Sequence, residues 1–250
     1  MTKAKSNILC IFEGEKREVG YFESMKQHFF GGQSIVHCCY GNDLYELEKI
    51  LSDDEDPESL DIFEVLKEHN QVTSNNAVNN NNDIFNNFSR DSFNQVYLFF
   101  DFEYHDNNYS PEKIKSLVSL FNEETELGKL FISYPMVEAV RDIPCYQTYH
   151  TYTVTLQDAK SSSYKASSAT KSKDFVNPKA ITEQNWIKLV NATAAKMNYV
   201  VHKNVNKGQF VDQDEILGVQ LSAIDLNANM YVLSSYPMFL YNQFPASRFV

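Results

Sequence analysis

The chain has 250 residues, of which 43% are hydrophobic, 14% aromatic and 22% charged, and its formal net charge is −11. This composition is that of a globular protein, and the length suits one large α/β domain or a core with a small appendage, which excludes a disordered chain. No apolar run approaches the about 20 residues that cross a bilayer, so we expect no membrane-spanning segment.

The start of the chain and its cysteines indicate a cytoplasmic protein. The first residues lead directly into a short strand-like run and do not read as a signal peptide. No CxxC spacing occurs among the four cysteines, which are Cys10, Cys38, Cys39 and Cys145. We therefore expect reduced thiols in apolar surroundings, and neither a zinc site nor a set of disulfides.

Strand-like and helical patterns alternate through the first part of the chain. Apolar runs of strand length occur at 7–12, 34–40, 95–101 and 129–133. Helical spacing of apolar residues predicts helices at 19–30, 44–51, 57–69 and 110–121. Asn42 or Asp43 could cap the second of these helices, and Pro57 and Pro111 would open the third and fourth. Because the strands are apolar on both faces, we predict an α/β fold with a mostly parallel sheet flanked by helices.

An asparagine-rich segment at 71–94 interrupts this alternation. It includes Asn75, Asn76 and the run 79–82, and it has few apolar side chains to bury. We expect an excursion over the surface that could be mobile.

The most informative stretch is 96–106, an apolar strand that ends in three acidic residues and a histidine. Asp101 and Glu103 are two residues apart, so on an extended chain their side chains point the same way. Two carboxylates on one side repel each other unless a cation lies between them, and Mg²⁺ takes oxygen ligands of this kind. The stretch therefore indicates a metal site or, alternatively, a solvated acidic turn.

Acidic residues also follow two other predicted strands. Glu13 comes directly after the first strand, and Pro135 begins a predicted helix whose first turn carries Glu138. In an open parallel sheet the carboxyl ends of the strands lie along one edge, where ligands bind. We therefore expect Glu13, Asp101 and Glu138 to converge at that edge.

The pattern changes from residue 151 onward. Residues 1–150 carry a net charge of −14, whereas residues 151–210 carry +6. We predict an acidic domain at 1–150 and a basic, mainly helical region at 151–250 that could pack on it. The basic stretch could bind a polyanion or could be an ordinary solvated surface.

Within the second region we expect four elements. A short strand spans 151–156, a flexible loop rich in Ser and Lys spans 160–173, and helices begin at Pro178 and near residue 212.

Three motifs, in this order, resemble those of the Toprim domain. The closest resemblance is to the RloB-like and OLD-family branch, found in bacterial anti-phage and abortive-infection systems. The first motif is an apolar strand, Glu-Gly-x-x-Glu and aromatic residues, matched here by Phe12-Glu13-Gly14-Glu15, Glu18 and Tyr21-Phe22. The second, normally Asp-x-Asp, reads Asp101-Phe-Glu103, and the third is Pro-x-x-Glu at 135–138. The resemblance covers about residues 6–142 without the asparagine-rich insert.

The resemblance implies that residues 1–150 form a Rossmann-like, Toprim-type catalytic domain that cleaves phosphodiester bonds with a metal. By analogy Glu13 would act as general acid and base and could also touch the metal. Asp101 and Glu103 would hold Mg²⁺ or Mn²⁺, and a second metal is compatible with the number of carboxylates. Glu138 would be a further ligand or would support one.

Basic residues that flank the same motifs could contact a phosphate; they are Lys16, Arg17, His105 and Arg141. His105 could instead be a metal ligand or a proton shuttle. For each of the four residues an ordinary surface charge is the alternative.

The sequence therefore favours a metal-dependent nuclease, the toxic effector of a bacterial anti-phage system. Its substrate would be RNA such as tRNA, or DNA, bound through phosphate contacts by the basic region 160–207. Relatives often work with a separately encoded ATPase, and this chain has no Walker A motif of its own.

Two other functional classes stay open. A catalytically degenerate Toprim fold would be a regulatory or sensor subunit, and Asp-x-Glu in place of Asp-x-Asp favours it. A phosphatase with Asp101 as nucleophile also places Asp-x-Asp after a strand, but this reading leaves Glu13 without a role.

Overall fold

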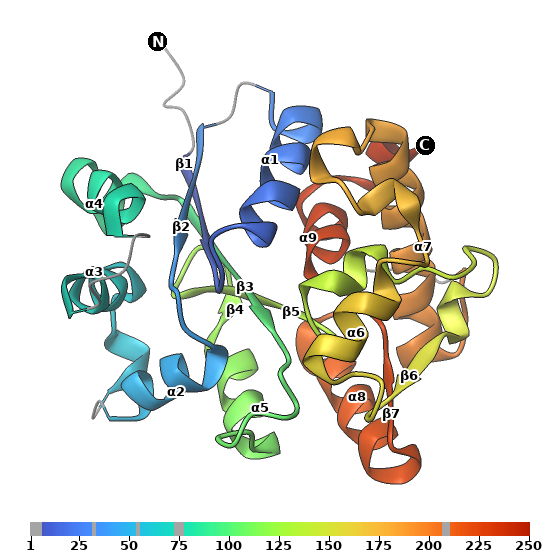
Figure 1. The fold of residues 1–250 in the computed structure, drawn as a ribbon. Coiled ribbons are helices and arrows are strands. Elements are labelled where there is room, and N and C mark those ends of the chain that lie inside the picture. The colour runs from blue at the N-terminus through green and yellow to red at the C-terminus, as the bar shows by residue number, and fades with distance from the viewer. Residues whose placement is uncertain (1–6, 32–33, 54–55, 73–77, 207–210) are drawn as a thin grey trace. The chain divides into compact units, whose positions relative to one another are not determined.

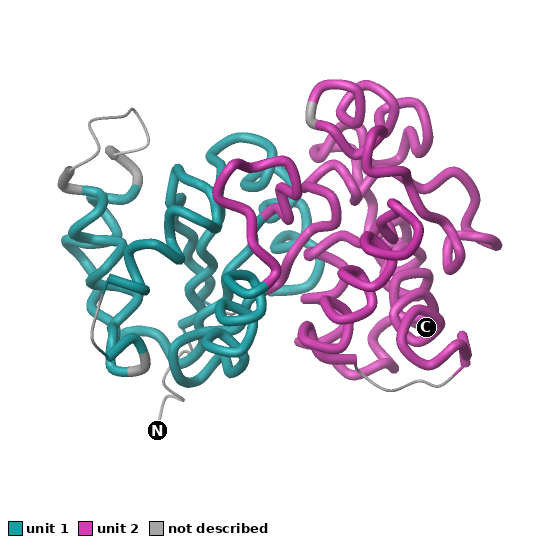
Figure 2. Tube along the Cα trace, turned by 90° about the horizontal axis from the view of Figure 1, so that it is seen from below, with its two compact units in different colours: residues 1–100, 112–130 teal, residues 101–111, 131–250 magenta. Residues whose placement is uncertain are grey.

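The computed structural model describes residues 7–31, 34–53, 56–72, 78–206 and 211–250. Its internal contacts divide the chain into two compact units (Figure 2). Unit 1 comprises Met1–Phe100 and Glu112–Leu130, and unit 2 comprises Asp101–Pro111 and Phe131–Val250. The expected division into domains at residue 150 is a different partition, and it stays a prediction.

A five-stranded sheet has the strand order β2-β1-β3-β5-β4 (Figure 1). The strands are β1 Asn7–Phe12, β2 Ser34–Cys39, β3 Gln95–Asp101, β4 Asn122–Glu123 and β5 Gly128–Ser133. β1 is parallel to both of its neighbours, with Phe12 opposite Cys39 of β2 and Phe99 of β3, whereas β4 is antiparallel to β5. The predicted α/β fold with a mostly parallel sheet is confirmed, and its inner strands are apolar because both of their faces are covered.

Helices flank the sheet on both faces. They are α1 Arg17–Phe29, α2 Leu44–Ser52, α3 Ile62–Val72, α4 Val78–Asn87 and α5 Pro111–Leu120. Figure 1 shows α1 on one face of the β1–β2 pair and α3 and α4 on the other. Connections between parallel strands are nearly always right-handed. Because β2 and β3 lie on opposite sides of β1, the helix between β1 and β2 and the helices between β2 and β3 then cover opposite faces of the sheet.

The asparagine-rich segment contains a helix where composition predicted an irregular excursion. Residues 78–87 form α4, whose Ile84 and Phe85 are buried. Asn81 uses its side-chain amide to pair with the backbone of Cys39 in the edge strand β2, accepting from its N–H (3.1 Å) and donating to its carbonyl oxygen (2.6 Å). These contacts supply the burial that the composition did not reveal. Residues 73–77 lie outside the described part of the chain.

Three prolines were expected to begin α-helices, and none of them does. Pro57 and Pro178 begin short 3-10 turns, and the α-helices after them start at Ile62 and Glu183. Side-chain oxygens mark the true starts, since Asp61 accepts from the N–H of Phe63 and Thr182 caps the longer helix. After Pro135 the chain forms only the 3-10 helix η3, Val137–Arg141.

Unit 2 is mainly helical, as predicted for the C-terminal region. Its α-helices are α6 Ser161–Ser168, α7 Glu183–His202, α8 Gln213–Asn227 and α9 Ser235–Gln243. A small antiparallel sheet pairs β6 Thr153–Thr155 with β7 Asn229–Tyr231. The expected basic loop at 160–173 is largely α6, whose Tyr164 and Ser168 are buried. Short 3-10 helices complete the described elements: η1 Pro57–Ser59, η2 Arg90–Ser92, η4 Tyr149–Thr151, η5 Lys173–Phe175, η6 Pro178–Ala180 and η7 Ala246–Phe249.

Within the described ranges, no helix is both long and apolar enough to cross a bilayer. All four cysteines are free thiols; Cys10 and Cys38 are buried as expected, Cys39 is half-buried, and Cys145 is exposed. The expectation of apolar surroundings is therefore wrong for Cys145, which lies in the connection between η3 and η4.

Candidate metal site

The loop after β3 carries the acidic residues of the informative stretch. Phe102 is fully buried, and its N–H donates to the carbonyl oxygen of Ser133, so the backbone is still anchored one residue beyond β3. Glu103 then adopts a positive φ of 39°, which ends the extended conformation. Side chains two residues apart point the same way only in an extended chain. The predicted alignment of the Asp101 and Glu103 side chains therefore does not hold at Glu103.

A turn brings Glu103 close to Asp106. The N–H of Asp106 donates to the carbonyl oxygen of Glu103 (2.9 Å), and the Asp106 side chain accepts from the N–H of Asn108 (2.6 Å). One carboxylate oxygen of Glu103 and one of Asp106 lie within 4.8 Å of each other. Two partly exposed carboxylates at this spacing can share one hard divalent cation.

Two acidic residues of one unit are candidate ligands of a metal ion, and the two are Glu103 and Asp106. Glu103 and Asp106 belong to unit 2. Asp43 belongs to unit 1, where one of its carboxylate oxygens accepts from the N–H groups of Tyr45 and Glu46 (both 2.9 Å) and so caps α2. From the sequence, Asp43 was predicted only as a possible cap, and the structure confirms that role.

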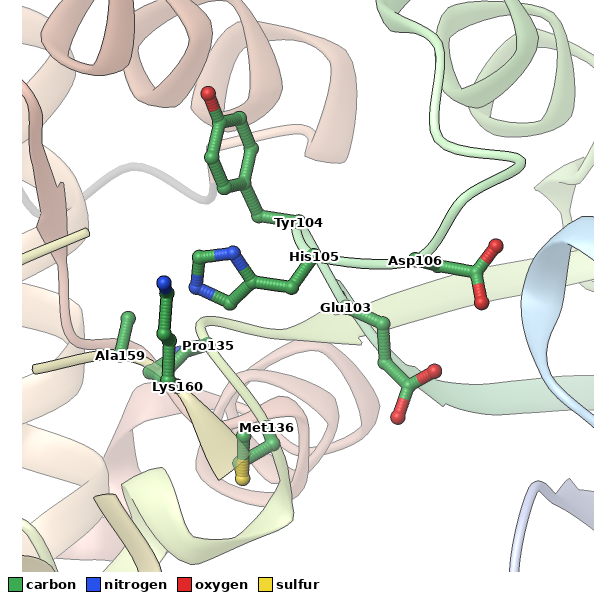
Figure 3. A pocket seen from close by; sticks show the side chains of 8 residues that line it. All are labelled: Glu103, Tyr104, His105, Asp106, Pro135, Met136, Ala159 and Lys160. Carbon is green, nitrogen blue, oxygen red and sulfur yellow. The ribbon is translucent and has the colours of Figure 1, made fainter. Parts of the chain in front are cut away.

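A pocket of about 510 Å³ adjoins Glu103 and Asp106 within unit 2. Its lining consists of Glu103, Tyr104, His105, Asp106, Pro135, Met136, Ala159 and Lys160. These residues come from three places, namely the loop after β3, the segment after β5, and the start of α6. In Figure 3 the His105 and Lys160 side chains lie on one side of the view and the two carboxylates on the other.

The basic side of the pocket is held by contacts inside unit 2. The Nε2 atom of His105 lies 3.0 Å from the carbonyl oxygen of Leu156, and since a carbonyl only accepts, Nε2 carries the hydrogen. Lys160 is exposed and is the N-cap residue of α6, and its carbonyl oxygen accepts from the N–H of Tyr164. Both side chains can therefore present positive charge or a proton to a ligand in the pocket.

Glu13 lies in unit 1, directly after β1. Its N–H donates to the carbonyl oxygen of Phe99 (3.2 Å), and its own carbonyl accepts from the N–H of Gly41 (2.9 Å). Gly14 follows, and the carboxylate of Glu18 lies 2.8 Å from where a Cβ at this position would be. Glu13 follows β1 and Asp101 ends β3, and these two strands are parallel neighbours, so both strand ends lie at one edge of the sheet.

Asp101 and Glu138 differ in exposure. Asp101 is half-buried as the last residue of β3, and Glu138 is fully buried (0% exposed) in η3. Among the described residues, the carboxylates found close enough to share a metal ion include that of Glu103 but not those of Asp101 and Glu138. The ligand roles of Glu13, Asp101 and Glu138 stay predictions.

The predicted phosphate contacts have different surroundings. Lys16 and Arg17 are exposed at the start of α1, and His105 lines the pocket. Arg141 is buried, with Nε donating to the hydroxyl of Ser168 (3.1 Å) and a guanidinium NH₂ group to the carbonyl oxygen of Lys165 (2.7 Å). These bonds attach η3 to α6, which gives Arg141 a structural role beside the predicted one.

Two residues of the site had no specific role in the sequence analysis, Asp106 and Lys160. Asp106 is the third acidic residue of the 96–106 stretch, but its spacing from Asp101 does not place the two side chains on one side of a strand. Only the turn brings it near Glu103. Lys160 was one of several lysines in a predicted loop. No local pattern distinguishes it, because it reaches the pocket only through tertiary folding.

No protein-family model matches the chain, and no curated protein or solved structure matches it significantly. The fold and the site therefore rest on the chain itself. It is an α/β protein with a mostly parallel five-stranded sheet, a helical C-terminal region and acidic residues that could hold a metal ion, and no family is identified.

Proposed function

We propose that this protein hydrolyses phosphodiester bonds in nucleic acid with a divalent cation, Mg²⁺ or Mn²⁺, held by Glu103 and Asp106. One observation carries the proposal: a single pocket of unit 2 is lined by two neighbouring carboxylates and by two basic side chains, His105 and Lys160. Carboxylates suit a hard cation, and basic groups suit the phosphate that the cation would act on.

The residues present fit such a cation. Both candidate ligands are partly exposed carboxylates within 4.8 Å of each other, and they offer hard oxygen donors while solvent can complete the coordination. When bound, the cation would polarise a phosphoryl oxygen, help to generate hydroxide from water and offset charge on the leaving oxygen.

The protein's own groups would position the phosphate and move a proton. Lys160 would hold a phosphate oxygen through its ammonium group. His105 donates from Nε2 to Leu156, so its Nδ1 atom is the one that can take up a proton or, once protonated, donate to the phosphate. Figure 3 shows both side chains on the side of the pocket away from the carboxylates.

The resemblance of three motifs to the Toprim domain supports the same reaction class. It adds Glu13 as general acid and base, and Asp101 and Glu138 as further metal-binding groups. The resemblance also supports a toxic effector role in bacterial anti-phage defence, with a separately encoded ATPase as partner. These finer assignments belong to the proposal.

The test is cleavage of total tRNA and of plasmid DNA by purified protein with Mn²⁺ or Mg²⁺, together with calorimetric titration of Mn²⁺. We expect metal-dependent cleavage that falls by at least about 10²-fold in Glu103→Gln and in Asp106→Asn. Mn²⁺ affinity should fall in both variants. Asp225→Asn is the matched control, because Asp225 is an exposed acid of α8 that does not line the pocket.

Asp101→Asn separates the two proposed ligand sets. Loss of Mn²⁺ binding in Asp101→Asn but not in Asp106→Asn would favour the ligands inferred from the motifs over the pair at the turn. Metal binding without cleavage of either substrate, also in the presence of a candidate ATPase partner, would contradict the nuclease and favour the regulatory subunit.

A further inference from the structure

The pocket beside Glu103 and Asp106 has the size and wall chemistry of a nucleotide site. Its volume of about 510 Å³ lies within the range of about 300–1,000 Å³ that small-molecule sites occupy. Pro135, Met136 and Ala159 provide an apolar wall, and all three are largely buried. An apolar wall with a few polar groups at its ends is the usual composition of a site for a flat organic group.

Tyr104 adds an aromatic surface to this pocket. Its ring meets the rings of His105 and Tyr109 edge-on, with centroids 5.3 and 4.9 Å apart, so its orientation is fixed by packing inside unit 2. Tyr104 is only half-buried, and it lines the pocket. Fixed, accessible aromatic rings are the surfaces on which unpaired bases stack.

The charges of the pocket are separated along it. Lys160 and His105 lie on one side and the carboxylates of Glu103 and Asp106 on the other (Figure 3). Helix α6 begins directly after Lys160, and the N-terminal end of a helix carries partial positive charge. A ligand that matches has a phosphate for the basic side and a flat base for the apolar wall. A cation held by the carboxylates would offset the charge of a neighbouring phosphate.

We propose that this pocket binds one unpaired nucleotide of a nucleic-acid strand, with its phosphate at Lys160 and its base against Tyr104, Pro135 and Met136. The proposal rests on the proposed function, because it names the substrate of the same site as single-stranded or looped nucleic acid. In a duplex the base is stacked and paired, so it could enter the pocket only after being flipped out at a cost of a few kcal/mol. Single-stranded substrate avoids that cost.

The test is equilibrium binding, which does not depend on cleavage. Fluorescence anisotropy is measured in Ca²⁺, which takes the same oxygen ligands, with a labelled mixed-sequence oligonucleotide that is either single-stranded or annealed into a blunt duplex. Competition by a free nucleoside monophosphate separates recognition of one nucleotide from recognition of a strand. Lys160→Ala and Tyr104→Leu remove the phosphate contact and the stacking surface. Lys179→Ala removes another exposed lysine of unit 2, one that does not line the pocket.

We expect the single strand to bind at least about tenfold more tightly than the duplex, and each pocket variant to bind it about tenfold more weakly than wild type. Lys179→Ala should lie within about twofold of wild type. Circular dichroism of each variant confirms that it is folded. If the free nucleoside monophosphate competes with the strand for wild type but not for Tyr104→Leu, the nucleotide is bound in the pocket.

Equal binding of duplex and single strand, or equal losses in Lys160→Ala and Lys179→Ala, would overturn the inference. Metal-dependent cleavage could persist in that case, so the proposed function would stand. Conversely, single-strand binding that requires Lys160 and Tyr104 without any cleavage would support the nucleotide site and contradict the nuclease.

Discussion

Glu103 has a backbone conformation that is uncommon for its residue type. Its φ of 39° lies in the left-handed region, which costs an L-residue roughly 1–2 kcal/mol relative to ordinary conformations. The turn that follows places its carboxylate within 4.8 Å of that of Asp106, where two negative charges repel in the absence of a cation. Both features oppose stability, and both are explained if the residue serves a ligand.

Replacing Glu103 by glycine should therefore stabilise the metal-free protein while weakening metal binding. Glycine accepts a positive φ without steric cost, and the repulsion with Asp106 disappears, so we expect the free energy of unfolding to rise by about 0.5–1 kcal/mol in urea titrations without metal. Ala228→Gly is the control, because Ala228 ends α8 with a φ of 50° and should gain similar stability with unchanged Mn²⁺ affinity. A less stable Glu103→Gly variant would show that the Glu103 side chain holds the loop together.

At the scale of elements, α4 protects the edge of the sheet. β2 is the outermost strand beside β1, so one side of its backbone has no strand partner within the sheet. Asn81 replaces that partner at Cys39 with a donor and an acceptor on one side chain. Covered edges prevent pairing with another chain, which is the usual hazard of an edge strand.

Asn81→Ala should destabilise unit 1 by about 1 kcal/mol, because it leaves a partly buried backbone N–H and carbonyl of β2 without their side-chain partner. Asn86→Ala on the exposed face of the same helix makes the same change in helix propensity and should alter stability by less than about 0.5 kcal/mol. Thermal or urea unfolding of the two variants measures the difference. Equal effects in both would mean that the pairing with Cys39 contributes nothing beyond propensity.

At the scale of the whole molecule, the basic character of residues 151–210 is only partly available to a polyanion. Lysines on the surface of this region are Lys160, Lys165, Lys171, Lys173, Lys179, Lys188 and Lys203. Lys196 is instead fully buried; its Nζ donates to the carbonyl oxygen of Tyr152 (2.6 Å) and lies 4.1 Å from the ring centroid of Tyr149. Asp142 is buried nearby and accepts from the hydroxyl of Tyr152 (3.2 Å). This pair makes the core of unit 2 sensitive to pH.

Burial lowers the pKa of Lys196 well below its ordinary value, and the nearby Asp142 carboxylate opposes this shift. At pH values between the lowered pKa and the ordinary value near 10.4, the unfolded chain binds more protons at Lys196 than the folded protein does. The contribution of this group to the free energy of unfolding therefore rises with pH. The pKa of Asp142 is raised by burial, so its contribution is complete below about pH 3.8 and is lost as pH rises through the raised value.

Lys196→Met should abolish the rise in stability on the alkaline side. Urea unfolding between about pH 7 and pH 10 should show the free energy of unfolding increasing for wild type relative to the variant. The variant also removes the hydrogen bond from Nζ to the carbonyl oxygen of Tyr152, so it should lose about 1–3 kcal/mol at neutral pH. Parallel pH profiles for wild type and Lys196→Met would contradict the lowered pKa.

The periodicity of apolar residues was sufficient to predict β1, β2, β3 and β5, α1, α2 and α5, and the α/β class, because each depends on which faces of a local segment are apolar. The same local logic located the cap at Asp43. It failed at α4 and α6, which are poor in apolar residues. Those helices are stabilised by a few buried side chains and by hydrogen bonds to residues far away in the sequence. Asn81 of α4 donates to the backbone of Cys39, and the backbone of Lys165 in α6 accepts from Arg141.

By itself, the sequence determined the order of strands and helices and the acidic character of the chain after β3, since both are written in contiguous residues. Only the tertiary structure decided which side chains share a site. The positive φ of Glu103 and the turn after it select Asp106 as its neighbour, and Lys160 comes to the same pocket from a segment more than fifty residues later in the sequence. Such proximity depends on long-range packing and on single backbone angles, and neither leaves a periodic signal in the sequence.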